Sequence, residues 1–199
     1  MIMMETERLV IRNFNINDWK DLHEMIVQYQ SSEYAIYDHE WPTSVEDIKG
    51  IAKWFADGDS YLAVCLKNTG KLIGYIALNH DKKDDALEFD LGYCFNFDYH
   101  SKGYATESCQ TLIDYAFEHL GADRIGTGTA SANHPSCRLL NRLGMKKIDE
   151  NIGSFRKTPD GKPIEFIGFS FALSKDEWLE HHQKNIIPIS KNHGALFGE

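Results

Sequence analysis

Three strand patterns follow one another in the middle of the chain, and they limit its possible folds more than any other feature. Residues 60–66 and 71–78 are apolar segments joined by the turn KNTG, residues 67–70, which is typical of a β-hairpin. A charged turn at 80–86 leads to a third strand over 87–97. Short turns force neighbouring strands to run antiparallel, which excludes a sheet wound entirely in parallel.

Patterns on both sides of this block complete the expected architecture. A strand at 8–14 precedes two helices, which we expect to be capped by Asn17 and Ser44. After the block come an amphipathic helix ending at Gly121, a strand, a short helix, two strands and a last helix. This order predicts an α+β protein, in which helices flank a mixed, mostly antiparallel sheet of about seven strands.

The length of 199 residues, 42% of them hydrophobic, favours one domain with one substantial core. We expect this domain to occupy residues 1–185 and to close with a helix that carries a capping box at Ser174 and Glu177. Residues 186–199 show no periodicity, so we expect a mobile C-terminal tail there.

Charge and cysteine content narrow the functional classes. A formal net charge of −9 disfavours nucleic-acid binding, which needs clustered Lys and Arg, and it suits small cationic substrates. No leader pattern or long apolar run is visible, so we expect a cytoplasmic protein without membrane contact, either monomeric or homodimeric. Four scattered cysteines lack metal-site spacing, so we expect no metal. They are Cys65, Cys94, Cys109 and Cys137.

The sequence YHSKGYATE connects the third of those strands to the amphipathic helix. A helix N-terminus attracts anions, because its first N–H groups lack intrahelical partners and the helix dipole is positive there. Gly103 and Ala105 leave the backbone approachable, while His100, Lys102 and Thr106 add donors. On this stretch alone, a pyrophosphate-binding turn and an ordinary loop both remain open.

Four segments, in order, resemble the GCN5-related N-acetyltransferases. YHSKGYATE is similar to that family's Q/R-x-x-G-x-G/A motif, with His100 in the Gln or Arg place. ETERLVIR at 5–12, DLGYCF at 90–95 and NHPSCRLLNRLGM at 133–145 resemble motifs of the branch that acetylates ribosomal-protein N-termini. The resemblance spans residues 5–180.

The resemblance implies transfer of an acetyl group from acetyl-CoA to a primary amine, by direct attack in a ternary complex. It also implies a sheet that splays between its fourth and fifth strands, with the pantetheine arm in the gap and the pyrophosphate on the glycine-containing turn. The residues that match cofactor-binding positions are Tyr93, Cys94, Phe95, His100, Ser101, Lys102, Gly103, Tyr104, Ala105, Thr106, Asn133 and Ser136.

Two carboxylates, Glu88 and Asp90, lie two residues apart on one strand and therefore share a face. An attacking amine must be neutral, although an alkylamine has a pKa of about 10, so a catalytic base is useful. Two close carboxylates would raise each other's pKa toward neutrality. A base, a binder of cationic substrate and a solvated sheet face all remain open for this pair.

The reaction also needs hydrogen-bond donors. Backbone N–H groups of Tyr93 or Cys94 suit the oxyanion. Many relatives use a tyrosine seven residues after the helix-capping Asn to act on the leaving thiolate, but here that position is Leu140, so we expect Ser136 to hydrogen-bond the sulfur. A covalent route through Cys94 or Cys137 is disfavoured, because neither has a neighbouring His in the sequence.

The loop between the first two helices supplies acceptor-site candidates, Tyr34, Tyr37 and Trp41, for which ordinary packing is the alternative. The acceptor stays open between a protein N-terminal amine and a small amine, because substrate loops vary on a shared fold. A catalytically silent module that binds CoA or a partner is the other functional class. Its only support is two departures from the family's pattern: Leu140 in place of the tyrosine, and His100 in place of Gln or Arg.

Overall fold

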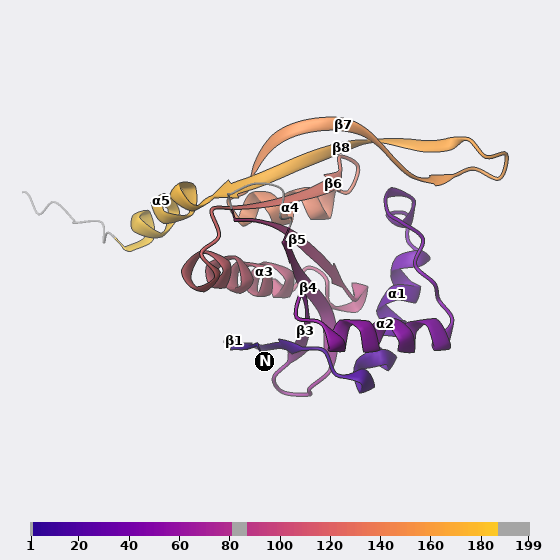
Figure 1. Ribbon diagram of the computed structural model, residues 1–199, viewed down its shortest axis with the longest axis horizontal. Coiled ribbons are helices and arrows are strands. Elements are labelled where there is room, and N and C mark those ends of the chain that lie inside the picture. The colour runs from indigo at the N-terminus through magenta and orange to yellow at the C-terminus, as the bar shows by residue number, and fades with distance from the viewer. Residues whose placement is uncertain (1, 81–86, 187–199) are drawn as a thin grey trace, which may run out of the picture.

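The computed structural model describes residues 2–80 and 87–186. Its sheet has eight strands in the order β1-β2-β3-β4-β5-β6-β8-β7, and every neighbouring pair except β5–β6 is antiparallel (Figure 1). The strands are β1 (Met3–Glu5), β2 (Leu9–Asn13), β3 (Tyr61–Leu66), β4 (Leu72–His80), β5 (Glu88–Phe95), β6 (Arg124–Ala130), β7 (Lys146–Lys157) and β8 (Pro163–Ser174). The α+β class is confirmed, with eight strands rather than about seven, because the short β1 forms an edge on β2.

Five α-helices flank the sheet. They are α1 (Trp19–Gln30), α2 (Val45–Asp57), α3 (Tyr104–Tyr115), α4 (His134–Arg142) and α5 (Lys175–Ile186). Most of the charged turn expected at 80–86 and of the tail expected at 186–199 lies outside the described residues.

Strand β3 is buried on both faces, which explains its unbroken apolar sequence. Leu62 and Val64 pack into the core beneath α3, α4 and α5. Ala63 and Cys65, which point the other way, pack into a second core beneath α1 and α2. Helices α3, α4 and α5 therefore cover one face of the sheet, and α1 and α2 cover the other.

Helix ends follow capping chemistry. Ser44 caps α2 by accepting from the Asp47 N–H, as expected. The cap expected at Asn17 is wrong: Asn15 caps a short 3-10 turn, and α1 begins at Trp19. The capping box expected in the last helix is confirmed, since the Ser174 N–H donates to the Glu177 carboxylate at 2.9 Å.

The sheet splays between β5 and β6, the fourth and fifth strands of the sequence-based count. These parallel strands pair at only three positions, ending with Asp90 opposite Gly126. At the next step the Thr127 hydroxyl, a side-chain group, donates to the Leu91 carbonyl at 2.7 Å. Beyond it the two strands part, which leaves backbone groups of β5 facing a gap.

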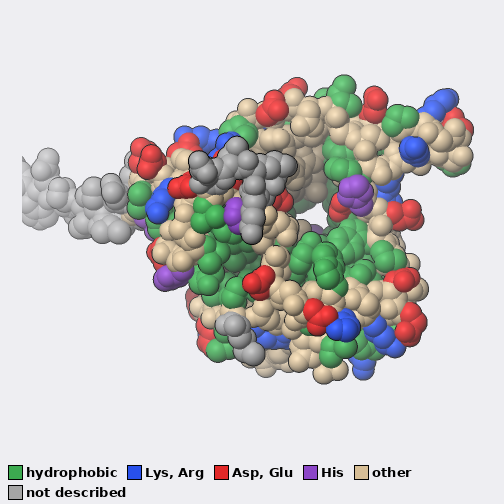
Figure 2. Space-filling model, viewed as in Figure 1, with side chains coloured by type: hydrophobic (Ala, Val, Ile, Leu, Met, Phe, Trp, Pro, Cys, Tyr) green, Lys and Arg blue, Asp and Glu red, His purple; other side chains and the backbone are tan. Residues whose placement is uncertain are grey.

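The hairpin of β7 and β8 extends past the sheet and reaches above the end of α1 (Figure 1). There Arg156 donates from Nε to the Asp38 carbonyl at 2.9 Å and from its terminal nitrogen to Gln30 Oε1 at 2.7 Å. The rings of Tyr37 and Phe166 meet edge to face, 5.4 Å apart. The hairpin is thereby attached to the loop between α1 and α2, and the chain closes around an opening that is visible in Figure 2.

Candidate active site

The gap between β5 and β6 continues into a cleft of about 910 Å³ that runs from the start of α3 to the loop between α1 and α2. Most of the residues predicted from the sequence line it. They are Tyr34, Tyr37, Trp41, Asp90, Tyr93, Cys94, Phe95, His100, Ser101, Gly103, Tyr104, Ala105, Thr106, Asn133 and Ser136.

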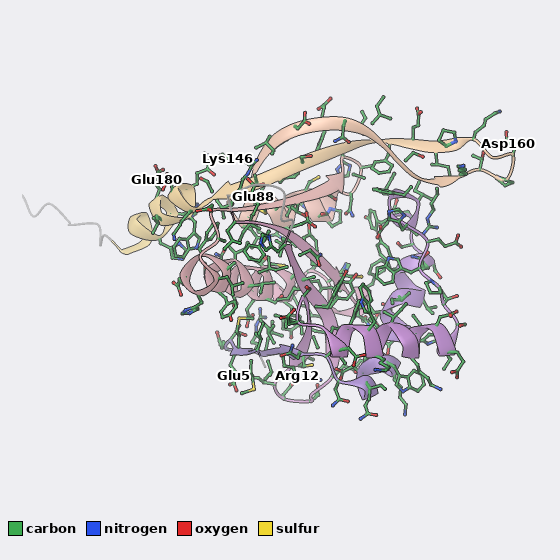
Figure 3. The ribbon with its side chains drawn as sticks, in the orientation of Figure 1. Glu5, Arg12, Glu88, Lys146, Asp160 and Glu180 are labelled. Carbon is green, nitrogen blue, oxygen red and sulfur yellow. The ribbon has the colours of Figure 1, made fainter. Side chains whose placement is uncertain are left out.

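Two predicted residues, Glu88 and Lys102, do not line this cleft. The half-exposed Glu88 carboxylate lies 3.6 Å from the Arg124 guanidinium, at the first residue of β5 and near the start of α5 (Figure 3). Lys102 Nζ donates to the Asp98 carbonyl at 2.9 Å and lies over the ring of Tyr99. Each side chain already has a partner outside the cleft.

The glycine-containing turn has the geometry of an anion site. Ser101 and Gly103 have φ of 60° and 84°, and the chain then enters α3 at Tyr104. The backbone N–H of Glu107 donates to the Gly103 carbonyl at 3.0 Å, which closes the first helical turn. The N–H groups of residues 104–106 therefore have no partner inside the helix and are available to an anion.

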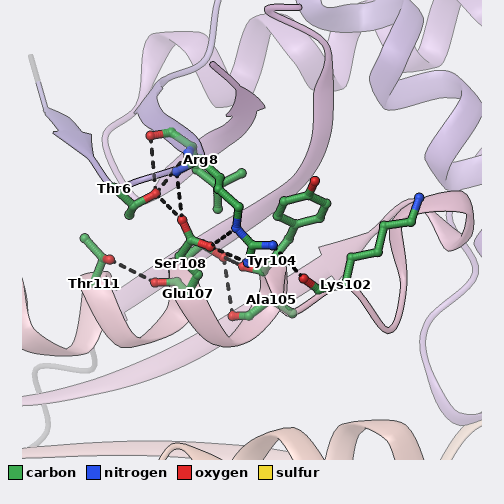
Figure 4. A network of polar contacts seen from close by, with 9 residues as sticks. Thr6, Arg8, Lys102, Tyr104, Ala105, Glu107, Ser108 and Thr111 are labelled. Carbon is green, nitrogen blue, oxygen red and sulfur yellow. Dashed lines mark hydrogen bonds and ion pairs between the residues drawn. The ribbon is translucent and has the colours of Figure 1, made fainter. Parts of the chain in front are cut away.

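A polar network behind this turn joins it to the N-terminal strands (Figure 4). Arg8 donates from Nε to Glu107 Oε2 at 2.7 Å and from Nη1 to the Lys102 carbonyl at 2.9 Å. Its guanidinium lies 4.5 Å from the Tyr104 ring centre. Burial pushes the pKa of Glu107 up, but hydrogen bonds from Thr6 and Arg8 outweigh it and leave the pKa below its ordinary value. Glu107 is thus ionised beside an anion site, and Arg8 compensates its charge.

His100 is occupied by the protein backbone. Its Nε2 lies 3.0 Å from the Phe95 carbonyl, and because a carbonyl only accepts, Nε2 carries the proton. The contact ties the turn to the end of β5. The His100 side chain thus orients the turn, and its Nε2 proton is bonded to the Phe95 carbonyl rather than available to a ligand.

The backbone groups of β5 alternate between the gap and β4. The Leu91 carbonyl accepts a bond from β6, whereas the Asn96 N–H donates to β4 at 2.9 Å. Since alternate residues of a strand direct their backbone groups to opposite edges, Tyr93 faces the gap and Cys94 faces β4. Of the two expected oxyanion donors, Tyr93 is the one on the correct edge.

Two hydroxyl groups meet across the gap. The Tyr93 hydroxyl lies 2.6 Å from Ser136 Oγ, and Ser136 is held in the first turn of α4, where its N–H donates to Asn133 Oδ1 at 3.2 Å. Leu140, at the position of the family's tyrosine, is fully buried in the core. The phenol of Tyr93, on β5, thus lies beside the Ser136 hydroxyl on α4, a contact that sequence reasoning missed.

Asp90 lies at the point where the strands separate. The residue is exposed to solvent on one side, but the surrounding protein desolvates its carboxylate and thereby raises its pKa. Desolvation, rather than repulsion from Glu88, is the cause of this shift. An aspartate of raised pKa beside the gap is a suitable proton acceptor.

The deciding comparison is with protein families. Residues 8–146 match the family model of the acetyltransferase (GNAT) domain. The chain belongs to the GNAT family. It is an N-acetyltransferase, as are its relatives from Bacillus subtilis (strain 168). The chain is 30% identical over 175 residues to the uncharacterized N-acetyltransferase YnaD, and the match covers 87% of this chain and 97% of YnaD. It is also 30% identical over 178 residues to the putative ribosomal N-acetyltransferase YdaF, covering 86% and 94%.

Solved structures agree on the GNAT fold. A GNAT-family acetyltransferase from Bacillus anthracis matches with a TM-score of 0.74 at 24% identity, over 88% of this chain and 99% of that one. The ribosomal-protein-S5-alanine acetyltransferase from Vibrio fischeri matches with a TM-score of 0.73 at 18% identity, over 89% and 99%. At these identities the likeness establishes the fold alone.

Two arginines of this GNAT domain were missed by sequence reasoning. Arg138 and Arg142 are four residues apart on α4, and both line the rim of the cleft. Arg142 Nε lies 3.4 Å from the Thr106 hydroxyl, in the first turn of α3. The charge of Arg142 therefore lies beside the glycine-containing turn, and only the packing of α4 against α3 reveals this.

The thiols of this GNAT domain are poor nucleophiles. Burial raises the pKa of Cys94 to about 12 and also raises that of Cys137. Across residues 2–80 and 87–186, no three His, Cys, Asp or Glu side chains gather as a metal-binding group would. No helix within the described part of the chain combines the length and apolar content needed to cross a membrane.

Proposed function

We propose that this GNAT enzyme transfers the acetyl group of acetyl-CoA directly to a primary amine, with both substrates bound in one complex. The observation that carries the proposal is the arrangement along a single cleft. An anion-binding turn lies at one end, a hydroxyl pair and a carboxylate flank the strand gap, and an aromatic, acidic region follows. This order matches a donor with phosphates at one end and a thioester at the other.

The residues at the turn fit the phosphates of acetyl-CoA. N–H groups of 104–106 point from the start of α3, Gly103 has no side chain, and Arg142 adds positive charge beside Thr106. The exposed backbone edge of β5 at Tyr93 fits the amide-bearing pantetheine arm. Once bound, acetyl-CoA supplies the thioester that is attacked.

The side chains at the gap divide the proton transfers between them. Asp90 accepts the proton that the amine loses as its nitrogen bonds to the acetyl carbon, directly or through one water. The Tyr93 and Ser136 hydroxyls carry two hydrogens, of which their mutual bond uses one. The other is available to the sulfur as the carbon–sulfur bond breaks, and the backbone N–H of Tyr93 is placed to stabilise the developing oxyanion.

The proposal leaves two acceptor classes, a protein N-terminal amine and a small amine. The names of YdaF and of the Vibrio fischeri enzyme mention ribosomal substrates. The aromatic, acidic end of the cleft supports a small cationic amine instead. The branch resemblance alone does not decide between them, because the substrate loops of a fold vary independently of its cofactor site.

Two measurements test the proposed function. Thermal-shift titration with acetyl-CoA should give a stabilisation that grows with ligand concentration relative to the dissociation constant. Thiol release should then depend on an added amine, in a panel of peptides, diamines, monoamines and aminoglycosides. Absence of any acetyl-CoA binding contradicts the proposal, whereas tight binding without turnover of any amine favours a catalytically silent module.

A further inference from the structure

A second carboxylate, Asp38, lines the aromatic end of the cleft. It follows a short 3-10 turn over Ala35–Tyr37. One of its oxygens accepts from the His39 N–H at 2.7 Å, and the other lies 3.5 Å from the Tyr29 hydroxyl. In the described part of the chain, no Lys, Arg or His side chain lies within ion-pair distance of this carboxylate.

Tyrosine side chains line the cleft together with this carboxylate: Tyr29, Tyr61 and Tyr75. Desolvation is the main cause that raises the pKa values of all three, and the charge of Asp38 contributes to each. Asp90 lines the same cleft, and its charge also raises the pKa of Tyr61. The two acidic groups therefore flank a shared aromatic surface, and such a surface attracts organic cations.

The arginine that contacts Asp38 forms no ion pair with its carboxylate. Arg156 approaches from β7, but it donates to the carbonyls of Asp38 and His39 and to Gln30 Oε1, which are all uncharged acceptors. Of the two arginines on α4 that line the cleft, Arg142 contacts the turn of α3, whereas the charge of Arg138 acts on Tyr34. Neither forms an ion pair with the Asp38 carboxylate, which therefore remains available to a cationic ligand.

The hairpin encloses this negative end. Besides the Arg156 bonds, Tyr37 packs on Phe166, and the rings of His39 and Phe155 lie 4.5 Å apart. These contacts connect the loop between α1 and α2 to β7 and β8 above the cleft. Such an arrangement favours a compact or thin ligand over the surface of a folded protein.

We propose that the acceptor is a small organic amine carrying a second positive charge, which Asp38 holds among the tyrosines while the reacting amine lies at Asp90. This inference rests on the proposed acetyl transfer and adds the class of the acceptor. Asp38 acts as a specificity residue. It recognises the part of the substrate that does not react, so its effect is to separate dications from monocations of equal length.

The experiment compares matched amines. The diamines 1,4-diaminobutane, 1,5-diaminopentane and 1,6-diaminohexane are each set against the monoamine of the same chain length, with kcat/KM measured at saturating acetyl-CoA. We expect the best diamine to exceed its monoamine by about tenfold or more, because one extra desolvated cation gains an ion pair and cation–π contacts. The preferred chain length then reports the separation of the two carboxylates in solution.

Asp38→Asn should lower the diamine activity and bring the diamine-to-monoamine ratio close to one. Glu40→Gln is the matched control, because it removes the same charge from an exposed residue of the same loop that does not line the cleft, and it should keep the wild-type ratio. Acetyl-CoA thermal shifts on both variants verify that the fold and the donor site are intact.

Several outcomes overturn this inference without touching the proposed function. Equal rates for matched amines, an unchanged ratio in Asp38→Asn, or a peptide N-terminus that outperforms every diamine would each do so while acetyl transfer still occurs. If wild-type protein binds acetyl-CoA but acetylates no amine at all, the proposed function itself fails. The two failures are therefore distinguishable in one data set.

Discussion

The two ends of the cleft are built by different means. At the start of α3, the proposed donor site consists of backbone N–H groups from one short turn, held in place by a single network that includes Arg8 and Glu107. The acceptor end consists of side chains brought together from the α1–α2 loop, β3, β4 and the β7–β8 hairpin. One end depends on local backbone geometry, whereas the other depends on tertiary packing.

This difference assigns distinct consequences to mutation. A backbone site is insensitive to most side-chain changes but fails where a Cβ or a charge blocks the approach. A side-chain site changes its preference with each substitution while the chain keeps its fold. Substitutions at one end should therefore alter affinity for acetyl-CoA, and those at the other should alter the choice of amine.

The strongest test of this division is Gly103→Glu. The added carboxylate repels the pyrophosphate, and the added Cβ lies 3.2 Å from a terminal nitrogen of Arg8, so the substitution also disturbs the network behind the turn. We expect acetyl-CoA affinity to fall about hundredfold or more, with loss of the thermal shift. Gly103→Ala isolates the strain of a Cβ at φ 84° from the charge, and Gly50→Glu adds the same charge to an exposed helix with no atom within 4 Å of its Cβ. Unchanged acetyl-CoA affinity in Gly103→Glu would rule out the donor site.

Asp90→Asn tests the junction of the two ends. Loss of the base should lower kcat about hundredfold, with little change in acetyl-CoA affinity. Because desolvation raises the pKa of Asp90, the wild-type kcat should fall as pH decreases through a value above the ordinary aspartate range, since the protonated carboxyl cannot accept a proton. This acid limb should be absent in the variant. A variant that retains both the rate and the acid limb would show that Asp90 is not the base.

The hydroxyl pair should give a smaller, purely catalytic effect. Ser136→Ala and Tyr93→Phe should each lower kcat about tenfold while leaving the KM for acetyl-CoA nearly unchanged, because the pair acts on the leaving sulfur. The double variant should lose little more than either single one, since the two hydroxyls act as a unit. Additive losses in the double variant would contradict a shared role. Thermal melts control for the buried hydroxyl that each change leaves without its partner.

The smallest expected effect concerns the network behind the turn. Arg8→Met leaves the ionised Glu107 uncompensated beside the phosphates, so the KM for acetyl-CoA should rise several-fold. Adding Glu107→Gln should restore most of the loss, and the whole effect should diminish at high salt. If the second substitution fails to restore acetyl-CoA binding, Arg8 supports the turn through packing on Tyr104 rather than through charge.

The donor end could be predicted from the sequence because it is contiguous. The strand, the turn and the helix that form it follow one another within residues 87–115, and Gly103 and Ala105 identify the approachable backbone. The α+β class followed equally from local patterns. The edge strand β1 escaped prediction because a three-residue strand has no measurable alternation.

The acceptor end was only partly predictable. Tyr34, Tyr37 and Trp41 were identified as candidates, but Asp38 in the same loop was not, because nothing local shows that it lines a cleft together with Tyr61 and Tyr75. The contact of Tyr93 with Ser136 joins residues 43 positions apart and depends on how α4 packs. Alternation put Glu88 and Asp90 on one face, but only the structure shows that β5 and β6 separate just beyond Asp90, which leaves Asp90 and not Glu88 in the cleft.

The hydroxyl of Thr127 sets a boundary in the sheet. Each further residue pair of a parallel ladder would extend it by about 3.3 Å and consume that much of the cleft. By bonding the Leu91 carbonyl through a side chain, Thr127 satisfies the last carbonyl that β6 can reach while keeping its own backbone at a distance. The Thr127 side chain thus marks where the backbone pairing of β5 and β6 ends and where the cleft between them begins.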